Sequence, residues 1–110
     1  MRQLLFDEIG QTDIKKIKHY LNKHAELSPL GGIYWVNLPE GLWDETQKAH
    51  TTCQPFYFAI EVGGNYVRIE LLIRSRQKLH CECIKYANSD QRNFILEFAD
   101  NLLSTLKIRT

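Results

Sequence analysis

The chain has 110 residues, with 14 Lys and Arg against 13 Asp and Glu, so its formal net charge is +1. This length fits one compact domain, and the balanced charge argues against strong electrostatic capture of nucleic acid. A hydrophobic content of 44% with 25% charged residues argues against disorder. Three cysteines are too few for a disulfide scaffold, and no apolar run approaches the ~18 residues of a membrane span.

We therefore expect a single α+β domain over residues 1–110, located in the cytoplasm, with no membrane partner. Residues 1–11 show no clear periodicity and are expected to be less ordered. In the next part of the chain, helical spacing of apolar residues predicts a helix over 12–26, with Thr12 as its cap. Residues 33–38 are rich in β-branched and aromatic side chains and predict a short strand, and a second helix is predicted over 40–51.

The middle of the chain predicts an antiparallel meander. Three segments alternate apolar and polar side chains, namely residues 56–62, 67–74 and 79–84. Gly64-Asn65 is typical of a two-residue hairpin loop, and this loop places Glu61 opposite Arg68 and Ile60 opposite Ile69.

A long C-terminal helix is expected to cover one face of this meander. Asn88 and Gln91 are spaced like a capping box, and a wide apolar stripe then continues to Leu106. The fold class is therefore α+β: a two-layer sandwich in α-β-α-β-β-β-α order, with an antiparallel three- or four-stranded sheet and helices packed on one face. The expected core is Phe56, Phe58, Ile60, Val67, Ile69, Leu71, Ile73, Cys81 and Cys83 against Phe94, Phe98, Leu102 and Leu106.

Histidine and cysteine form one candidate metal set, which consists of His50, Cys53, Cys81 and Cys83. Four N/S ligands suit tetrahedral zinc. On an extended strand, however, Cys81 and Cys83 have α-carbons ~6.6 Å apart and parallel side chains, whereas zinc needs their sulfurs within about 4 Å. We therefore favour core packing for these thiols and expect no metal and no cofactor.

Catalysis and nucleic-acid binding receive less support. Cys53 with His50 is the one local thiol–histidine pair, and no hydrolase or nucleotide-binding motif accompanies it, so an enzyme is not favoured. Tyrosines and arginines share one face of the predicted sheet, as in sheets that stack bases. Glutamates on the same face offset the arginines, so nucleic acid is not the expected partner.

The face of the meander turned away from the C-terminal helix is the expected binding surface, and we call it the outward face. Tyrosine and arginine, which it carries, are enriched at protein interfaces. The candidate partner-binding residues are Tyr57, Arg68, Glu70, Leu72, Arg74, His80 and Glu82, with Trp35 and Trp43 at the rim. The sequence thus favours a non-catalytic protein-binding module whose simplest partner is a second copy of itself, with a His/Cys metal or small-ligand site as the alternative and a nucleic-acid-binding domain as the second alternative.

Overall fold

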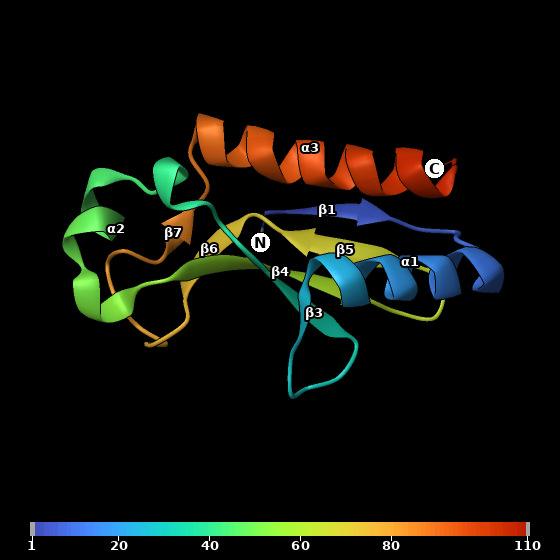
Figure 1. Ribbon diagram of the computed structural model, residues 1–110, viewed down its shortest axis with the longest axis horizontal. Coiled ribbons are helices and arrows are strands. Elements are labelled where there is room, and N and C mark those ends of the chain that lie inside the picture. The colour runs from blue at the N-terminus through green and yellow to red at the C-terminus, as the bar shows by residue number, and fades with distance from the viewer. Residues whose placement is uncertain (1, 110) are drawn as a thin grey trace.

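The structure is a computed structural model, and it describes residues 2–109. The α+β class is confirmed: helices pack on an open, seven-stranded antiparallel sheet (Figure 1). The strands are β1 (Gln3–Phe6), β2 (Glu26–Leu27), β3 (Ile33–Asn37), β4 (Phe56–Val62), β5 (Val67–Glu70), β6 (Leu72–Ser75) and β7 (Lys85–Tyr86). The main path runs β1-β5-β4-β3-β2, while β6 extends the pairing along β4 and carries β7 at its other side.

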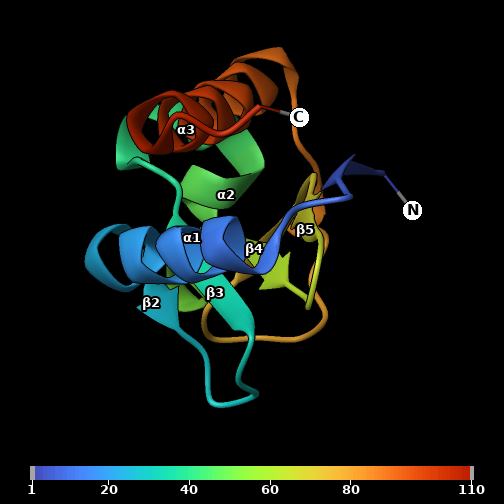
Figure 2. The ribbon, with the colours of Figure 1, turned by 90° about the vertical axis from the view of Figure 1, so that its right-hand side faces the viewer.

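The two long helices lie on the same side of the sheet, as expected (Figure 2). They are α1 (Gln11–His24) and α3 (Ser89–Leu106), and they contact each other. Gly10 rather than Thr12 is the N-cap of α1, and the helix ends two residues earlier than predicted. Asn88 and Gln91 form the predicted capping box of α3. In the described part of the chain, no helix is long and apolar enough to cross a membrane.

The core lies between these helices and the sheet. Along β4 every second residue is buried, starting at Phe56, because side chains alternate between the two faces of a strand. Phe58 is fully buried and meets Phe94 and Phe98 edge to face, with ring centroids 6.3 and 6.0 Å away. Most of the predicted core is buried. Five of its residues are only partly buried, namely Leu71, Cys81, Phe94, Phe98 and Leu106.

The hairpin register agrees with the prediction, because Glu61 pairs with Arg68 and Ile60 with Ile69. The second strand of this hairpin is interrupted at Leu71, so that it forms β5 and β6 instead of one element. Here the Leu71 N–H donates to the carbonyl of Arg2 and its own carbonyl accepts from Ala87. Beyond the interruption the pairing shifts by two residues, which keeps the same faces buried.

Two predicted elements are wrong. Residues 79–84 form turns instead of a strand, because the Ser75 hydroxyl accepts the N–H groups of Gln77 and Lys78 and turns the chain out of β6. The expected helix over 40–51 is broken into a 3₁₀ turn η1 (Glu40–Leu42), the short α2 (Glu45–Ala49) and a 3₁₀ turn η2 (Thr51–Cys53). Asp44 starts α2 as its N-cap, which requires extended backbone at that residue and so ends the preceding turn. Strands β1, β2 and β7 were not indicated by the sequence pattern.

Candidate metal centre

The first pair of candidate ligands flanks a single 3₁₀ turn. His50 follows the last residue of α2, and its carbonyl accepts the N–H of Cys53 at 3.0 Å. Side chains three residues apart on such a turn lie on the same side. The Ser75 hydroxyl holds the other end of this turn, because it donates to the Cys53 carbonyl at 2.5 Å.

The second pair lies in a tight turn. The Cys81 carbonyl accepts the N–H of Ile84 at 3.0 Å, so residues 81–84 fold back instead of running on as a strand. The parallel, widely spaced thiols of an extended segment were the reason for disfavouring a metal here. That geometric objection does not apply to a turn, in which Cys81 and Cys83 direct their sulfurs to one place.

The two turns bring all four candidate ligands together. Each of the four side chains offers one ligand atom, and these atoms all lie within 4.8 Å of one another; the residues are His50, Cys53, Cys81 and Cys83. The His50 Nδ1 is 2.9 Å from the Cys81 Sγ, and the Cys53 Sγ is 3.5 Å from the same sulfur. Tetrahedral zinc with bonds of ~2.3 Å holds its sulfurs about 3.8 Å apart, so only small movements separate this cluster from a coordination shell.

The cluster shifts the pKa values of two of its thiols in opposite directions. The pKa of Cys81 is lowered from 9.0 to about 6, chiefly by hydrogen bonds from the side chain and backbone of Cys83 and further by Cys53 and His50. Burial raises the pKa of Cys83 to about 12, and the adjacent sulfurs add to this effect. Cys81 is partly exposed, whereas Cys53 and Cys83 are buried. A thiolate therefore forms first at Cys81, in the middle of the cluster.

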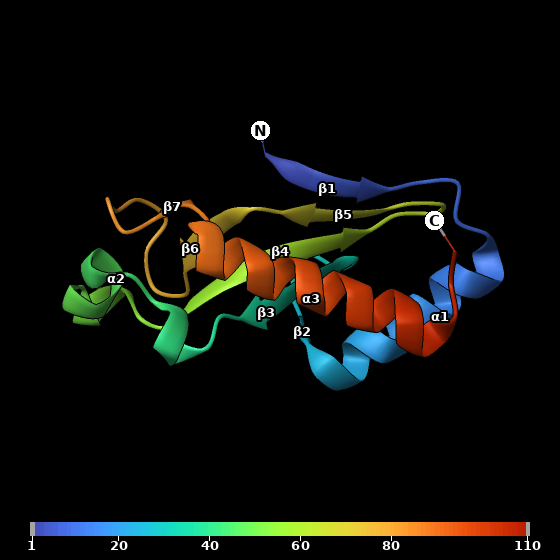
Figure 3. The same cartoon turned by 90° about the horizontal axis from the view of Figure 1, so that it is seen from above.

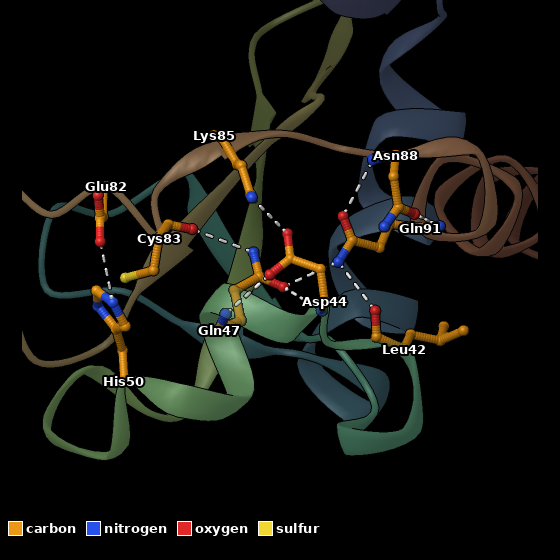
Figure 4. Close-up of polar contacts among 9 residues, drawn as sticks. All are labelled: Leu42, Asp44, Gln47, His50, Glu82, Cys83, Lys85, Asn88 and Gln91. Carbon is orange, nitrogen blue, oxygen red and sulfur yellow. Dashed lines mark hydrogen bonds and ion pairs between the residues drawn. The ribbon is translucent and has the colours of Figure 1, made fainter.

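The imidazole of His50 is held from its other side as well. Its Nε2 faces the carboxylate of Glu82 at 3.4 Å (Figure 4). Its Nδ1 faces the sulfur of Cys81. A metal-binding histidine commonly donates its second ring N–H to a carboxylate, which fixes the ring and makes the free nitrogen a better ligand. Glu82, which the sequence pattern placed on the outward face, is thus a neighbour of the cluster instead.

Two buried amides connect the cluster to α3. The Gln47 side chain donates to the Cys83 carbonyl at 3.2 Å, and its oxygen accepts from Gln91 at 3.0 Å (Figure 4). Gln91 also donates to the carbonyl of Leu42 at 2.9 Å. Both glutamines occupy the fourth position of a capping box, after Asp44 and Asn88 respectively. The spacing of Asn88 and Gln91 indicated one half of this network, and the same spacing of Asp44 and Gln47 is the sequence signal for the other half.

The structure separates the predicted partner-binding residues into three places. Six of them lie on sheet strands at partly exposed positions: Trp35, Tyr57, Arg68, Glu70, Leu72 and Arg74. Their arginines already have carboxylate partners, because Arg68 contacts Glu61 at 2.8 Å and Arg74 contacts Glu70 at 3.0 Å.

His80 and Glu82 are not on the sheet, since the expected third strand is absent, and they lie in the loop that carries Cys81 and Cys83. Trp43 packs on the opposite, buried side of the sheet: its ring meets Phe56 edge to face at 5.2 Å, and its Nε1 donates to the Leu38 carbonyl. The two tryptophans therefore do not form one rim.

The cluster has the features of a closed site. Five surface hollows in residues 2–109 are lined by other side chains, so no substrate pocket among them reaches the sulfurs. The histidine lies against Cys81 rather than Cys53, so the thiol–histidine pair suggested by local spacing is replaced by a pair from distant segments. Four side-chain ligands fill a tetrahedron and leave no open position for a reacting group.

Comparison with known protein families, with curated proteins and with solved structures gave no match. The chemistry of the four clustered side chains is therefore the basis on which a function is proposed.

Proposed function

We propose that this protein binds one Zn²⁺ ion through His50, Cys53, Cys81 and Cys83, and that the ion has a structural role. The single observation that carries the proposal is the convergence of the four ligand atoms within 4.8 Å, from two segments about thirty residues apart. A set of three cysteines and one histidine is typical of structural zinc. Thiolate and imidazole ligands disfavour Mg²⁺ and Ca²⁺, which take oxygen ligands.

The place of the cluster in the fold supports a structural role. The two ligand-bearing segments contain short turns and a five-residue helix, and they contribute few large apolar side chains to the core. An ion bound between η2 and the turn at 81–84 would connect segments that otherwise share mainly polar contacts. The free energy of binding zinc would then contribute directly to the folding of this part of the molecule.

Metal analysis of protein purified without an affinity tag, in reducing buffer, tests the proposal. We expect about one zinc per chain, and cobalt substitution should give the visible absorption of tetrahedral thiolate coordination. Protein that has three reduced thiols, and that still holds far less than one equivalent after incubation with zinc, would contradict it.

Ligand variants with a matched control make the test specific. Cys83→Ser and His50→Ala should lose stoichiometric zinc, whereas His50→Cys should retain it as a four-cysteine site. His80→Ala is the control, because His80 is exposed next to Cys81 but does not belong to the cluster. Glu82→Gln should weaken zinc binding by roughly tenfold, since it removes only the carboxylate behind the ring.

A second candidate function is protein binding through the outward face. Its support is that α1 and α3 both lie on the other side, so neither long helix covers the tyrosine- and arginine-bearing face. Trp35 and Tyr57 contact each other there at 4.9 Å between centroids, and the Arg76 guanidinium lies over the Trp35 ring at 4.7 Å. Aromatic and arginine side chains of this kind are common energetic centres of interfaces.

Sedimentation of the wild-type protein and of a double variant, Tyr57→Glu with Leu72→Glu, tests whether this face binds a second copy. If this face forms the dimer, the double variant should be a folded monomer. A wild-type protein that is monomeric at high micromolar concentration would exclude the homodimer.

A further inference from the structure

Strand β1 (Gln3–Phe6) is an open edge of the sheet. It pairs with β5 on one side, and Figure 3 shows no element of the chain along its other side. The opposite edge is β2, which has only two residues and is followed closely by Pro29. Short strands and prolines protect sheet edges from pairing with other chains, and β1 carries neither proline nor lysine.

The ladder to β5 determines which groups of β1 are free. Leu71 donates its N–H to the carbonyl of Arg2, so these two residues form a hydrogen-bonded pair. In an antiparallel ladder such pairs alternate with non-bonded ones. The hydrogen-bonded partners along β1 are therefore Leu4 and Phe6, whereas Gln3 and Leu5 direct their N–H and C=O groups away from the sheet.

Apolar surface lies on both sides of this free edge. On the outward face Leu5 is 49% exposed. On the core side Leu4 and Phe6 are only partly buried. Next to Phe6 there is a wholly apolar hollow between the sheet and α3, which Leu103 also lines. A strand added beside β1 would therefore gain apolar contacts on both of its faces.

The order of residues along β1 indicates that the added strand is a second copy. A basic residue, Arg2, precedes the apolar centre, and two acidic residues, Asp7 and Glu8, follow it. Two such strands that run antiparallel bring the basic end of one chain against the acidic end of the other. Arg2 has no carboxylate within 4.0 Å among residues 2–109, so this charge is available; its guanidinium lies over the Tyr86 ring instead.

We propose that two chains associate by antiparallel pairing of their β1 strands about a two-fold axis at Leu5, which joins the two sheets into one. In this register Leu5 exchanges both backbone hydrogen bonds with Leu5 of the second copy. Leu4 lies opposite Phe6, and Arg2 lies beside the acidic end of the partner strand, where the chain leaves the strand after Phe6 and bends at Glu8 with a φ of 55°. Arg109 borders the same hollow as Asp7 and Glu8. The acidic end of β1 therefore already has one basic neighbour, and the incoming Arg2 would lie beside it. The proposal is independent of zinc binding, since none of the four metal ligands lies in β1.

The test is sedimentation equilibrium of the full zinc-treated chain from about 1 µM to about 1 mM, the range that covers weak association. Leu5→Pro removes a backbone N–H that the ladder to β5 does not use, so the variant should fold and lose the dimer. Leu5→Val is the matched control, because it keeps the N–H and an apolar side chain and should still dimerise. Arg2→Glu should weaken the dimer, and the double variant Arg2→Glu with Glu8→Arg should restore it.

The results separate this interface from the outward face. Loss of the dimer in Leu5→Pro but not in Leu5→Val, together with restoration by the charge swap, supports pairing through β1. If Leu5→Pro is folded and dimerises as strongly as wild type, or if wild type is monomeric throughout, the proposal is wrong. Should Leu5→Pro not fold, Arg2→Glu and its restoring double variant decide the same question.

Discussion

Two regions of this molecule are stabilised in different ways. In the first, which we call the sheet region, strands β1 to β5 pack against α1 and α3 through large apolar side chains such as Phe58, Ile60 and Ile95, all fully buried. In the second, the cluster region of residues 38–54 and 76–88, the fully buried side chains are Gln47, Cys53 and Cys83. There the contacts are hydrogen bonds between amides, backbone and thiols.

The difference concerns what each region needs in order to fold. Apolar burial is non-directional and tolerates small shifts, so the sheet region depends mainly on the volume and pattern of its side chains. Polar networks are stabilising only when each member has its partner, and an unpaired buried group is costly. The cluster region should therefore respond sharply to changes in single polar atoms and to metal.

The largest effect is expected in the sheet region. Phe58→Ala removes a fully buried ring from between β4 and α3 and should destabilise the protein by about 3–5 kcal/mol. Denaturant titration of zinc-saturated protein measures this loss. A loss below ~1 kcal/mol would contradict the assignment of Phe58 to the centre of the core.

A smaller effect with a different location is expected for Gln91→Leu. The change leaves the Leu42 carbonyl and the Asn88 N–H without their partner, which should cost about 1–3 kcal/mol. Hydrogen exchange should show the loss of protection chiefly in the cluster region and at the start of α3. Gln77→Leu is the matched control, because Gln77 is exposed and its side chain has no role in the network. Equal effects of both variants would show that the buried amide network contributes no stability.

The sequence predicted the sheet region better than the cluster region, for a physical reason. Alternation in β4, the hairpin at Gly64-Asn65 and the Asn88 capping box are local signals, and all three agree with the structure. Residues 79–84 alternate in the same way but turn, because the hydroxyl of Ser75 accepts two backbone N–H groups. Residues 76–84 contain no glycine or proline that would indicate a turn.

The candidate metal ligands were found by residue type alone, and their arrangement was not. His50 and Cys53 are close in sequence, but their approach to Cys81 depends on tertiary structure across about thirty residues. The four-residue β1 has three consecutive apolar residues, Leu4 to Phe6, so its sequence shows no alternation. Its pairing with β5 is a long-range contact that local pattern does not encode.

A third prediction concerns the reactivity of the thiols in metal-free protein. Because the pKa of Cys81 is lowered to about 6, Cys81 is a thiolate above that pH and a neutral thiol below it. Its alkylation by iodoacetamide should therefore fall about tenfold between pH 7 and pH 5. Cys83, whose pKa is raised to about 12, should stay unreactive over the same range. Mass spectrometry of modified peptides measures both rates, and zinc should suppress the reaction of Cys81. A midpoint near pH 9 for Cys81 would contradict its activation by the cluster.

The smallest effect compares one ion pair from each region. Lys85 contacts Asp44 at 2.9 Å in the cluster region, and Arg68 contacts Glu61 at 2.8 Å in the sheet region. Lys85→Met and Arg68→Met should each cost about 0.2–1 kcal/mol, because partly exposed pairs gain little over solvation of their charges. Lys85 is the better target of its pair, since Asp44 also caps α2 through its other oxygen and its replacement would remove both contacts.

If polar contacts matter more where apolar burial is scarce, Lys85→Met should be at the upper end of that range and Arg68→Met at the lower end. Asp44 is also the more buried of the two carboxylates, with 20% of its side chain exposed against 39% for Glu61, so its pair is screened less by water and salt. Denaturant titrations at low and high salt measure both differences. Salt should remove most of the Arg68 effect and less of the Lys85 effect, and the reverse order would mean that the cluster region does not depend more strongly on its charges.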